Sequence, residues 1–158
     1  MQPLLVKGDL LDQRVDVIVN AWNRNLFPAW LLVPQGVARA IRRRAGNAPF
    51  REVHRHGLIP LGGAVLTSAG RLPYRGVIHV AGINLLWFAT RESIRGSVRS
   101  AMRIVAEQQF GSVAFPIIGS GSGNRSRATA LRYMLEEFAT IESNARVLIV
   151  EYDRGRAD

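Results

Sequence analysis

The sequence predicts an α/β fold in which helices cover both faces of a sheet. Short runs of β-branched and other apolar residues alternate along the chain with longer segments whose apolar residues recur every three to four positions. This alternation is typical of sheets whose parallel strands are joined by helices, so that both faces are buried. The chain has 158 residues, no internal repeat and no linker-like stretch, which favours one domain with a substantial core.

Six apolar segments are expected to be strands. They are residues 4–6, 15–19, 64–67, 77–81, 113–118 and 147–152. Valine, isoleucine and leucine dominate most of them, and glycine or polar turn residues flank them. Three of the strands lead into segments of interest, namely residues 20–23, residues 119–124 and Tyr152. Because ligands bind beyond the carboxyl ends of the strands in such sheets, these three segments are expected to share one cleft.

Four segments are expected to be helices, at residues 36–45, 48–56, 90–110 and 128–141. Gly46 is a suitable stop for the first, and Pro49 suits the first turn of the second. Thr90 is expected to cap the third helix and Gly111 to end it. Apolar faces are formed by Ile94, Val98, Ala101, Met102 and Val105 in the third helix, and by Leu131, Leu135 and Phe138 in the fourth. Residues 24–34, with two prolines, are expected to form a long irregular loop.

Composition limits the chemistry available to the chain. The absence of cysteine excludes disulfides, thiolate catalysis and cysteine-bound metals. No apolar run approaches the roughly 20 residues of a membrane span, and the N-terminus lacks the features of a signal peptide, so we expect a cytoplasmic protein without a membrane partner. His79 lies in an apolar strand and is expected to be a hydrogen-bonded structural residue, whereas His54 and His56 are expected to face solvent. No metal-ligand pattern is present, so no metal site is expected.

Arginine carries the charge of the chain. The formal net charge is +9, and Lys7 is the only lysine. The densest cluster is residues 42–44, with Arg51 and Arg55 nearby, and guanidinium groups suit bidentate contacts to phosphate. Binding of RNA or DNA through this basic surface is one interpretation. A solvated arginine-rich surface is the other, and no aromatic residues lie among these arginines to stack on bases.

A loop of small residues follows the fifth predicted strand. Residues 119–123 read Gly-Ser-Gly-Ser-Gly, and a helical pattern begins at Ser126. A ligand can approach the backbone N–H groups of such a loop closely, because glycine lacks Cβ and tolerates positive φ. Amides beside a helix N-terminus form anion sites, so the loop is a candidate phosphate cradle. A simple turn is the alternative, since the loop matches neither the P-loop nor the Rossmann glycine spacing.

Several segments, in their order and spacing, resemble the motifs of macrodomains, a family that binds ADP-ribose. Residues 8–10 resemble G-D-[IL], residues 15–23 resemble V-D-A-I-V-N-A-A-N, and residues 36–41 resemble the end of G-G-G-V-D-x-A-I. Residues 60–64, residues 77–79 and the phosphate loop at residues 115–123 are similar to further family motifs. The resemblance covers nearly the whole chain. It implies a three-layer α/β/α fold with a mixed, mostly parallel central sheet, formed by one macrodomain over residues 1–153 with a polar tail at 154–158.

The resemblance also implies roles for individual residues. Asp9 would accept a hydrogen bond from the adenine amino group, Tyr152 would stack on adenine, and Asn23 would hydrogen-bond the distal ribose and serve as the catalytic candidate. The residues implied to contact ADP-ribose are Asp9, Leu10, Ala21, Asn23, Gly36, Val37, Ile118, Gly119, Ser120, Gly121, Ser122, Gly123, Asn124 and Tyr152. For each of these three residues a structural role is the alternative to ligand binding. Asp9 and Asn23 would then stabilise turns, and Tyr152 would be an aromatic residue at the rim that covers the end of the sheet.

The chain departs from the family pattern where catalysis would occur. Ala38 stands where the hydrolases of the family have an aspartate that positions or activates water, and Pro34, which has no N–H, replaces a glycine of that loop. Arg39 would either neutralise phosphate or face solvent. Three functions therefore stay open, none of which needs a cofactor. They are hydrolysis of ADP-ribosyl or O-acetyl-ADP-ribose bonds, non-catalytic reading of ADP-ribose on protein or nucleic acid, and nucleic-acid binding through the arginine-rich face.

Overall fold

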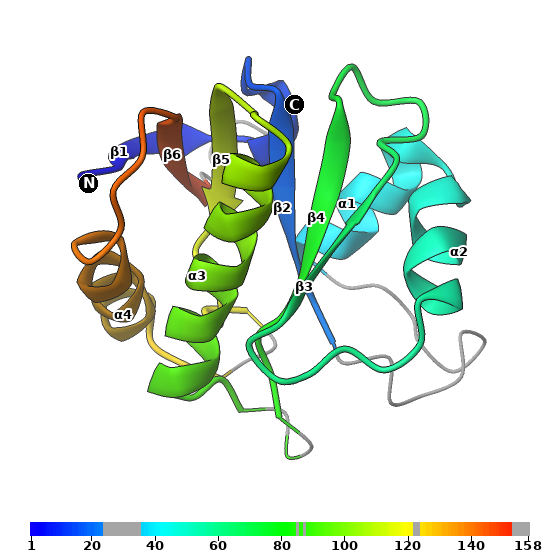
Figure 1. Cartoon of the computed structure of the whole chain (residues 1–158). Coiled ribbons are helices and arrows are strands. Elements are labelled where there is room, and N and C mark those ends of the chain that lie inside the picture. Colours follow the sequence, from blue (N-terminus) through cyan, green and yellow to red (C-terminus); the bar gives the residue numbers. More distant parts are fainter. Residues whose placement is uncertain (24–35, 85, 87, 122–123, 153–158) are drawn as a thin grey trace.

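Six strands form one mixed sheet at the centre of the molecule (Figure 1). They are β1 (Leu4–Gly8), β2 (Val17–Trp22), β3 (Ala64–Thr67), β4 (Gly76–Ala81), β5 (Ser112–Pro116) and β6 (Arg146–Tyr152). Their order is β1-β6-β5-β2-β4-β3, and every neighbouring pair is parallel except β3, which is antiparallel to β4. This computed structural model describes residues 1–23, 36–84, 86, 88–121 and 124–152.

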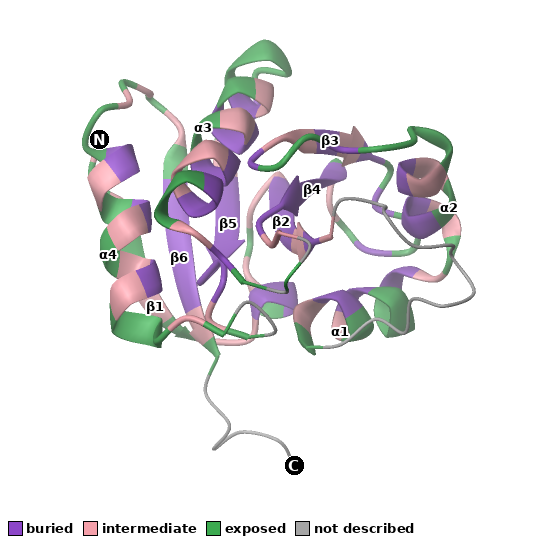
Figure 2. Ribbon diagram, turned by 90° about the horizontal axis from the view of Figure 1, so that it is seen from below, coloured by how far each residue is buried: buried purple, intermediate pink, exposed green. Residues whose placement is uncertain are grey.

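Helices pack on both faces of the sheet, which gives the three layers predicted (Figure 2). The helices are α1 (Gly36–Ala45), α2 (Ala48–Arg55), α3 (Arg91–Glu107) and α4 (Arg127–Phe138), with a short 3-10 helix, η1 (Leu10–Asp12). Strand residues alternate between the layers, so that in β2 Val17 and Val19 join the cluster under α3 and α4, while Ile18 joins the cluster under α1 and α2. The expected α/β fold with a mostly parallel sheet is confirmed.

Capping residues set several helix boundaries as the sequence indicates. Thr90 caps α3 in a capping box with Ser93, and Ser126 caps α4. Gly46 follows α1 with φ +83°. The predicted end of α3 is wrong, because the helix stops at Glu107 and Gln109 takes φ +53°.

The inner face predicted for α4 is partly wrong. Leu135 is 41% exposed, and the buried positions of α4 are Ala130, Met134, Glu137 and Phe138. The buried face therefore includes Ala130 and Met134, each one position before Leu131 and Leu135 of the predicted face, and it also includes the charged residue Glu137. The helix also ends at Phe138, three residues before the expected end.

The carboxyl ends of five strands meet at one edge of the sheet. Strands β1, β6, β5, β2 and β4 are parallel, so Gly8, Tyr152, Pro116, Trp22 and Ala81 end at the same edge. β2 runs on to Trp22, so Asn20 and Ala21 lie within the strand, whereas the sequence placed them after it. The domain boundary predicted at residue 153 and the loop at residues 24–34 lie outside the described residues.

Candidate functional site

The loop after β5 begins at this carboxyl edge and is held by its own hydrogen bonds. The Ser120 hydroxyl donates to the Ile117 carbonyl at 2.8 Å, and the Arg125 amide donates to the Gly119 carbonyl at 3.1 Å. The Arg125 Nε also donates to the Ala89 carbonyl at 2.9 Å, which ties the loop to the segment before α3. These bonds hold Gly119, Ser120 and Arg125 in place, which lowers the entropy cost of binding a ligand at these residues.

Two glycines of this loop differ in what a side chain would meet. Gly119 is buried with φ +87°, and a Cβ there would lie 2.6 Å from the Ala89 Cβ. The fold itself therefore requires glycine at this position. Gly121 is exposed without a positive φ, and a Cβ there would meet no described atom within 4 Å. Neither of these two glycine amides donates to the backbone carbonyl of a described residue.

The end of the loop turns into the N-terminus of α4. Asn124 is exposed with φ +52°, a conformation that asparagine tolerates better than most residues. Its amide donates to the Gly121 carbonyl at 3.3 Å. Ser126 then caps α4 by accepting the Thr129 amide at 3.2 Å. The loop thus lies where amides and the helix dipole favour an anion. Ile118 is buried, and Ser122 and Gly123 lie outside the described residues.

Asp9 and Tyr152 are brought together by the pairing of β1 with β6. Gly8 and Tyr152 are register partners, so Asp9 follows directly beside Tyr152. Asp9 caps η1, since its Oδ1 accepts the Leu11 amide at 2.8 Å, so the turn-stabilising role is present. Its Oδ2 accepts no hydrogen bond from the described residues. The Tyr152 side chain is 54% exposed, and Leu10 is buried.

The start of α1 borders the same edge, because α1 follows β2 along the chain. Gly36 has φ +53° and is exposed, and Val37 is half-buried. Ala38 is buried with Ile41 against the sheet, and so presents only a methyl group to the core. Arg39 is exposed, as the solvent-facing interpretation expects.

A buried polar trio supports the end of β2. Asn20 Nδ2 lies 3.0 Å from His79 Nδ1, and His79 Nε2 lies 2.9 Å from the Thr67 hydroxyl. Burial, and then the nearby His54, lowers the pKa of His79 to about 3, so the ring is neutral and bonds through both nitrogens. The structural role predicted for His79 is confirmed. Sequence reasoning missed that Asn20 and Thr67 are its partners, because they reach His79 only through the pairing of β2 and β3 with β4.

Beyond this trio, Trp22 ends β2 and Asn23 follows it. The Trp22 ring lies edge-on to His54, with 5.8 Å between ring centroids. His54 is therefore half-buried and does not face solvent as expected; burial and then the charge of Arg42 lower its pKa. His56 is exposed, as expected. Asn23 and Ala21 are half-buried at the carboxyl end of β2.

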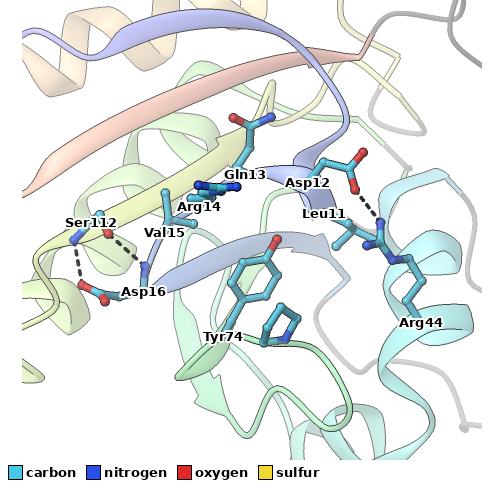
Figure 3. Close-up of a pocket in the computed structure, with 10 residues that line it drawn as sticks. Leu11, Asp12, Gln13, Arg14, Val15, Asp16, Arg44, Tyr74 and Ser112 are labelled. Atoms are coloured by element: carbon cyan, nitrogen blue, oxygen red, sulfur yellow. Dashed lines mark hydrogen bonds and ion pairs between the residues drawn. The ribbon is translucent and has the colours of Figure 1, made fainter.

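A surface pocket lies at the opposite edge of the sheet, where the strands begin (Figure 3). Tyr74, Arg44 and Ser112 are among the residues that line it. Three of its four charged side chains are bonded within the protein, since Arg44 bonds Asp12 at 3.0 Å and Asp16 accepts the Ser112 amide at 3.0 Å, while Arg14 is exposed and forms no ion pair with a described residue. The sequence did not single out this pocket, and it does not include the predicted site residues.

The described part of the chain shows neither a metal-binding cluster nor a membrane-spanning helix. No three histidine or acidic side chains lie close enough there to hold a metal ion. No helix there combines the length and the apolar character needed to cross a membrane. The cytoplasmic location expected from the sequence stays a prediction.

The sequence is similar to known macrodomain proteins along nearly its whole length. A Macro domain-containing protein of Streptomyces griseus is 38% identical over 160 residues, which cover 94% of this chain and 86% of the relative. The O-acetyl-ADP-ribose deacetylase of Escherichia coli K12 is 33% identical over 165 residues, which cover 97% of this chain and 89% of the relative.

Solved structures agree with the sequence relatives. The Oceanobacillus iheyensis macrodomain with MES bound has a TM-score of 0.81 and 27% identity, covering 96% of this chain and 84% of that chain. A variant of the same macrodomain, solved with ADPR, has the same TM-score of 0.81 and covers 96% of this chain and 85% of that chain. The family profile described as Macro domain matches residues 19–134. Since that match spans more than half of the sequence and the fold agrees with it, this chain belongs to the macrodomain family.

Proposed function

We propose that this protein binds ADP-ribose at the carboxyl edge of its sheet. The proposal depends most on the open space around Gly121. The described residues leave space beside Gly121, and its backbone needs no glycine, so a ligand that approaches the backbone closely accounts for the absence of a side chain. Together with the Gly119 amide, the Gly121 amide would hold the diphosphate beside the N-terminus of α4, whereas the Ser120 amide donates to the Ile117 carbonyl at 3.4 Å and would have to exchange that bond for one to phosphate.

The remaining site residues suit the other parts of the ligand. On one side of the loop, the Asp9 Oδ2 would accept the adenine amino group while the exposed Tyr152 ring stacks on the base. On the other side, Asn23 would bond the distal ribose, and the Val37 amide at the start of α1 would contact phosphate. The structural relative solved with ADPR supports the choice of ligand.

Calorimetric titration with ADP-ribose tests this proposal. We expect micromolar binding of ADP-ribose and much weaker binding of AMP, which lacks the diphosphate and the distal ribose. The Gly121→Glu variant should lose binding, because a carboxylate would occupy and repel the diphosphate site. Asn144→Glu is the matched control, since it makes the same charge change at an exposed residue two positions before β6, at the other edge of the sheet. Unchanged affinity in Gly121→Glu would remove the loop from the site.

Hydrolysis of O-acetyl-ADP-ribose is a second candidate, favoured by the deacetylase relative from Escherichia coli. Water would add to the ester carbonyl on the distal ribose, and the ester bond would break to release acetate and ADP-ribose. Ala38 offers no base, so catalysis would depend on positioning by Asn23 and on the amide cradle. Loss of a general base typically costs about 10²–10⁴-fold in rate, so slow turnover is expected.

Acetate release by wild type and by Asn23→Ala tests the hydrolase proposal. We expect Asn23→Ala to lower turnover more than it lowers ADP-ribose affinity, because Asn23 would position the reacting water. Equal losses of turnover and affinity would make Asn23 a binding residue only. No acetate release from the wild-type protein, with ADP-ribose binding intact, would leave a non-catalytic reader.

A further inference from the structure

Positive charge is unequally divided between the two helical layers. Residues 36–72, which span α1, α2, β3 and the turns around them, contain seven arginines and one acidic residue, Glu52. Helices α3 and α4 on the opposite face contain six arginines and four glutamates. A bias of the whole sequence toward arginine would enrich both layers, so it does not account for the shortage of acidic residues on one of them.

The two layers also differ in how their arginines are paired. Each of the six arginines of α3 and α4 forms an ion pair with a glutamate; Arg95 and Arg99, for example, both bond Glu137. In the α1–α2 layer, Arg44 pairs with Asp12, and no other arginine there forms an ion pair with a described residue. Most of the positive charge of the α1–α2 layer is therefore not neutralised by ion pairs with described residues.

We call the exposed set Arg39, Arg42, Arg43, Arg51, Arg55 and Arg71 the arginine face. Arg71 extends the face past the end of α1, because its guanidinium lies over Gly46 and its Cζ is 3.6 Å from the position that a Cβ would take there. The one nearby acid, Glu52, accepts hydrogen bonds from the Ser68 amide and hydroxyl, and its pKa is lowered by these bonds and then by the charges of Arg55 and Arg51, so it offsets part of their charge without forming an ion pair with a described residue. Arg42 Nε donates to Asn47 Oδ1 at 2.9 Å and Arg71 Nε donates to the Arg44 carbonyl at 3.5 Å, while the other four guanidinium groups of the face donate no hydrogen bond to a described residue.

The same face does not suit a membrane. A basic amphipathic helix binds a bilayer by inserting its apolar side, but the apolar side of α1, Ala38, Ile41 and Ala45, is buried in the core. An array of guanidinium groups does suit phosphodiesters, which accept bidentate hydrogen bonds and release counterions when they are neutralised. Since no aromatic residue is exposed on α1 or α2, the contacts would be to the backbone and not to bases.

We propose that the arginine face binds the phosphate backbone of a nucleic acid without regard to sequence. This binding is independent of the ADP-ribose cleft. The face extends away from the cleft, because α1 starts at Gly36 beside the carboxyl edge and Arg44, near its end, lines the pocket at the opposite edge.

Fluorescence anisotropy with labelled 20-nucleotide DNA duplexes of two unrelated sequences, between 50 and 200 mM salt, tests the proposal. We expect equal affinity for both sequences and a linear fall of log K with log salt, with a slope of about −0.9 per phosphate contacted. Arg43→Gln/Arg51→Gln should weaken binding on the order of 50-fold at 0.1 M salt and reduce the slope by about 2. Both residues are exposed and have no ion-pair partner among the described residues.

The matched control is Arg103→Gln/Arg132→Gln, which removes the same charge from exposed positions on the opposite layer. We expect its affinity and slope to match the wild type. Equal losses in both double variants would overturn the proposal, because net charge alone would then explain binding. Absence of duplex binding, or tighter binding to a polyglutamate peptide, would also overturn it. ADP-ribose affinity measured in parallel should be unchanged in both variants, so failure of the cleft proposal remains distinguishable.

Discussion

At the scale of single residues, two glycines in the loop after β5 are needed for different reasons. The fold requires Gly119, whereas a bound ligand would require Gly121. At Gly119, the positive φ disfavours a side chain, and a Cβ would lie only 2.6 Å from the Ala89 Cβ. At Gly121, neither restriction applies within the described residues. Alanine should therefore have different effects at these two positions, on folding in one case and on binding in the other.

We expect Gly119→Ala to lower the free energy of unfolding by about 2–4 kcal/mol, from left-handed backbone strain and overpacking together. Gly121→Ala should leave stability within about 0.5 kcal/mol of wild type while weakening ADP-ribose binding. Denaturant unfolding and calorimetry measure the two effects. A stable Gly119→Ala protein would show that Ala89 and its neighbours move aside, and so that the loop is not fixed by packing.

Much of this residue-scale detail could be predicted, with clear limits. The glycine-serine loop, the cap at Thr90 and the buried role of His79 follow from local chemistry. The partners of His79 could not be predicted, because Asn20 and Thr67 lie on β2 and β3 and meet His79 of β4 only through sheet pairing. The half-buried state of His54 likewise depends on Trp22, which is distant in sequence.

At the scale of elements, α4 shows where hydrophobic periodicity misleads. Glu137 is buried to 1% exposure, yet a charged residue counts as surface in any apolar pattern. Its carboxylate accepts from Arg95 Nε at 2.8 Å and from Arg99 Nε at 2.6 Å, which joins α3 to α4. Burial raises the pKa of Glu137, but the hydrogen bonds and charges of Arg99 and Arg95 together lower it below its usual value.

We expect Glu137→Gln to cost about 2–3 kcal/mol of unfolding free energy at pH 7, because a buried, charge-assisted pair of hydrogen bonds is lost. Since the pKa is lower in the folded state than in the unfolded state, this stabilisation is complete above pH 4.5 and is lost as pH falls through the folded value. The difference between wild type and variant should therefore shrink below pH 4.5 in urea titrations.

Glu136→Gln is the matched control for that measurement. Glu136 also pairs with two arginines, Arg91 at 2.9 Å and Arg132 at 3.4 Å, but its side chain is 29% exposed. Exposed pairs contribute about 0–1 kcal/mol, so this variant should lose much less stability. Equal losses would mean that burial does not strengthen the Glu137 contacts.

At the scale of the whole molecule, the sheet gathers residues that the sequence separates. Asp9 and Tyr152 lie at opposite ends of the chain and become neighbours because β1 pairs with β6. Alternation of strands and helices predicted the layers and the shared edge, since these follow from periodicity and from the handedness of crossovers. The division of charge between the layers could not be predicted, because it depends on which helices share a face.

A last prediction concerns both proposed surfaces together. ADP-ribose at 100 times its Kd should stabilise the fold by about 2.7 kcal/mol and raise Tm by about 5–10 °C for a chain of this size. A DNA duplex at low salt should add its own shift, because the arginine face and the carboxyl edge are separate sites whose binding energies add. Differential scanning fluorimetry with each ligand and with both measures this. A combined shift no larger than the greater single shift would mean that the duplex occupies the ADP-ribose cleft, which would contradict a separate nucleic-acid surface on α1 and α2.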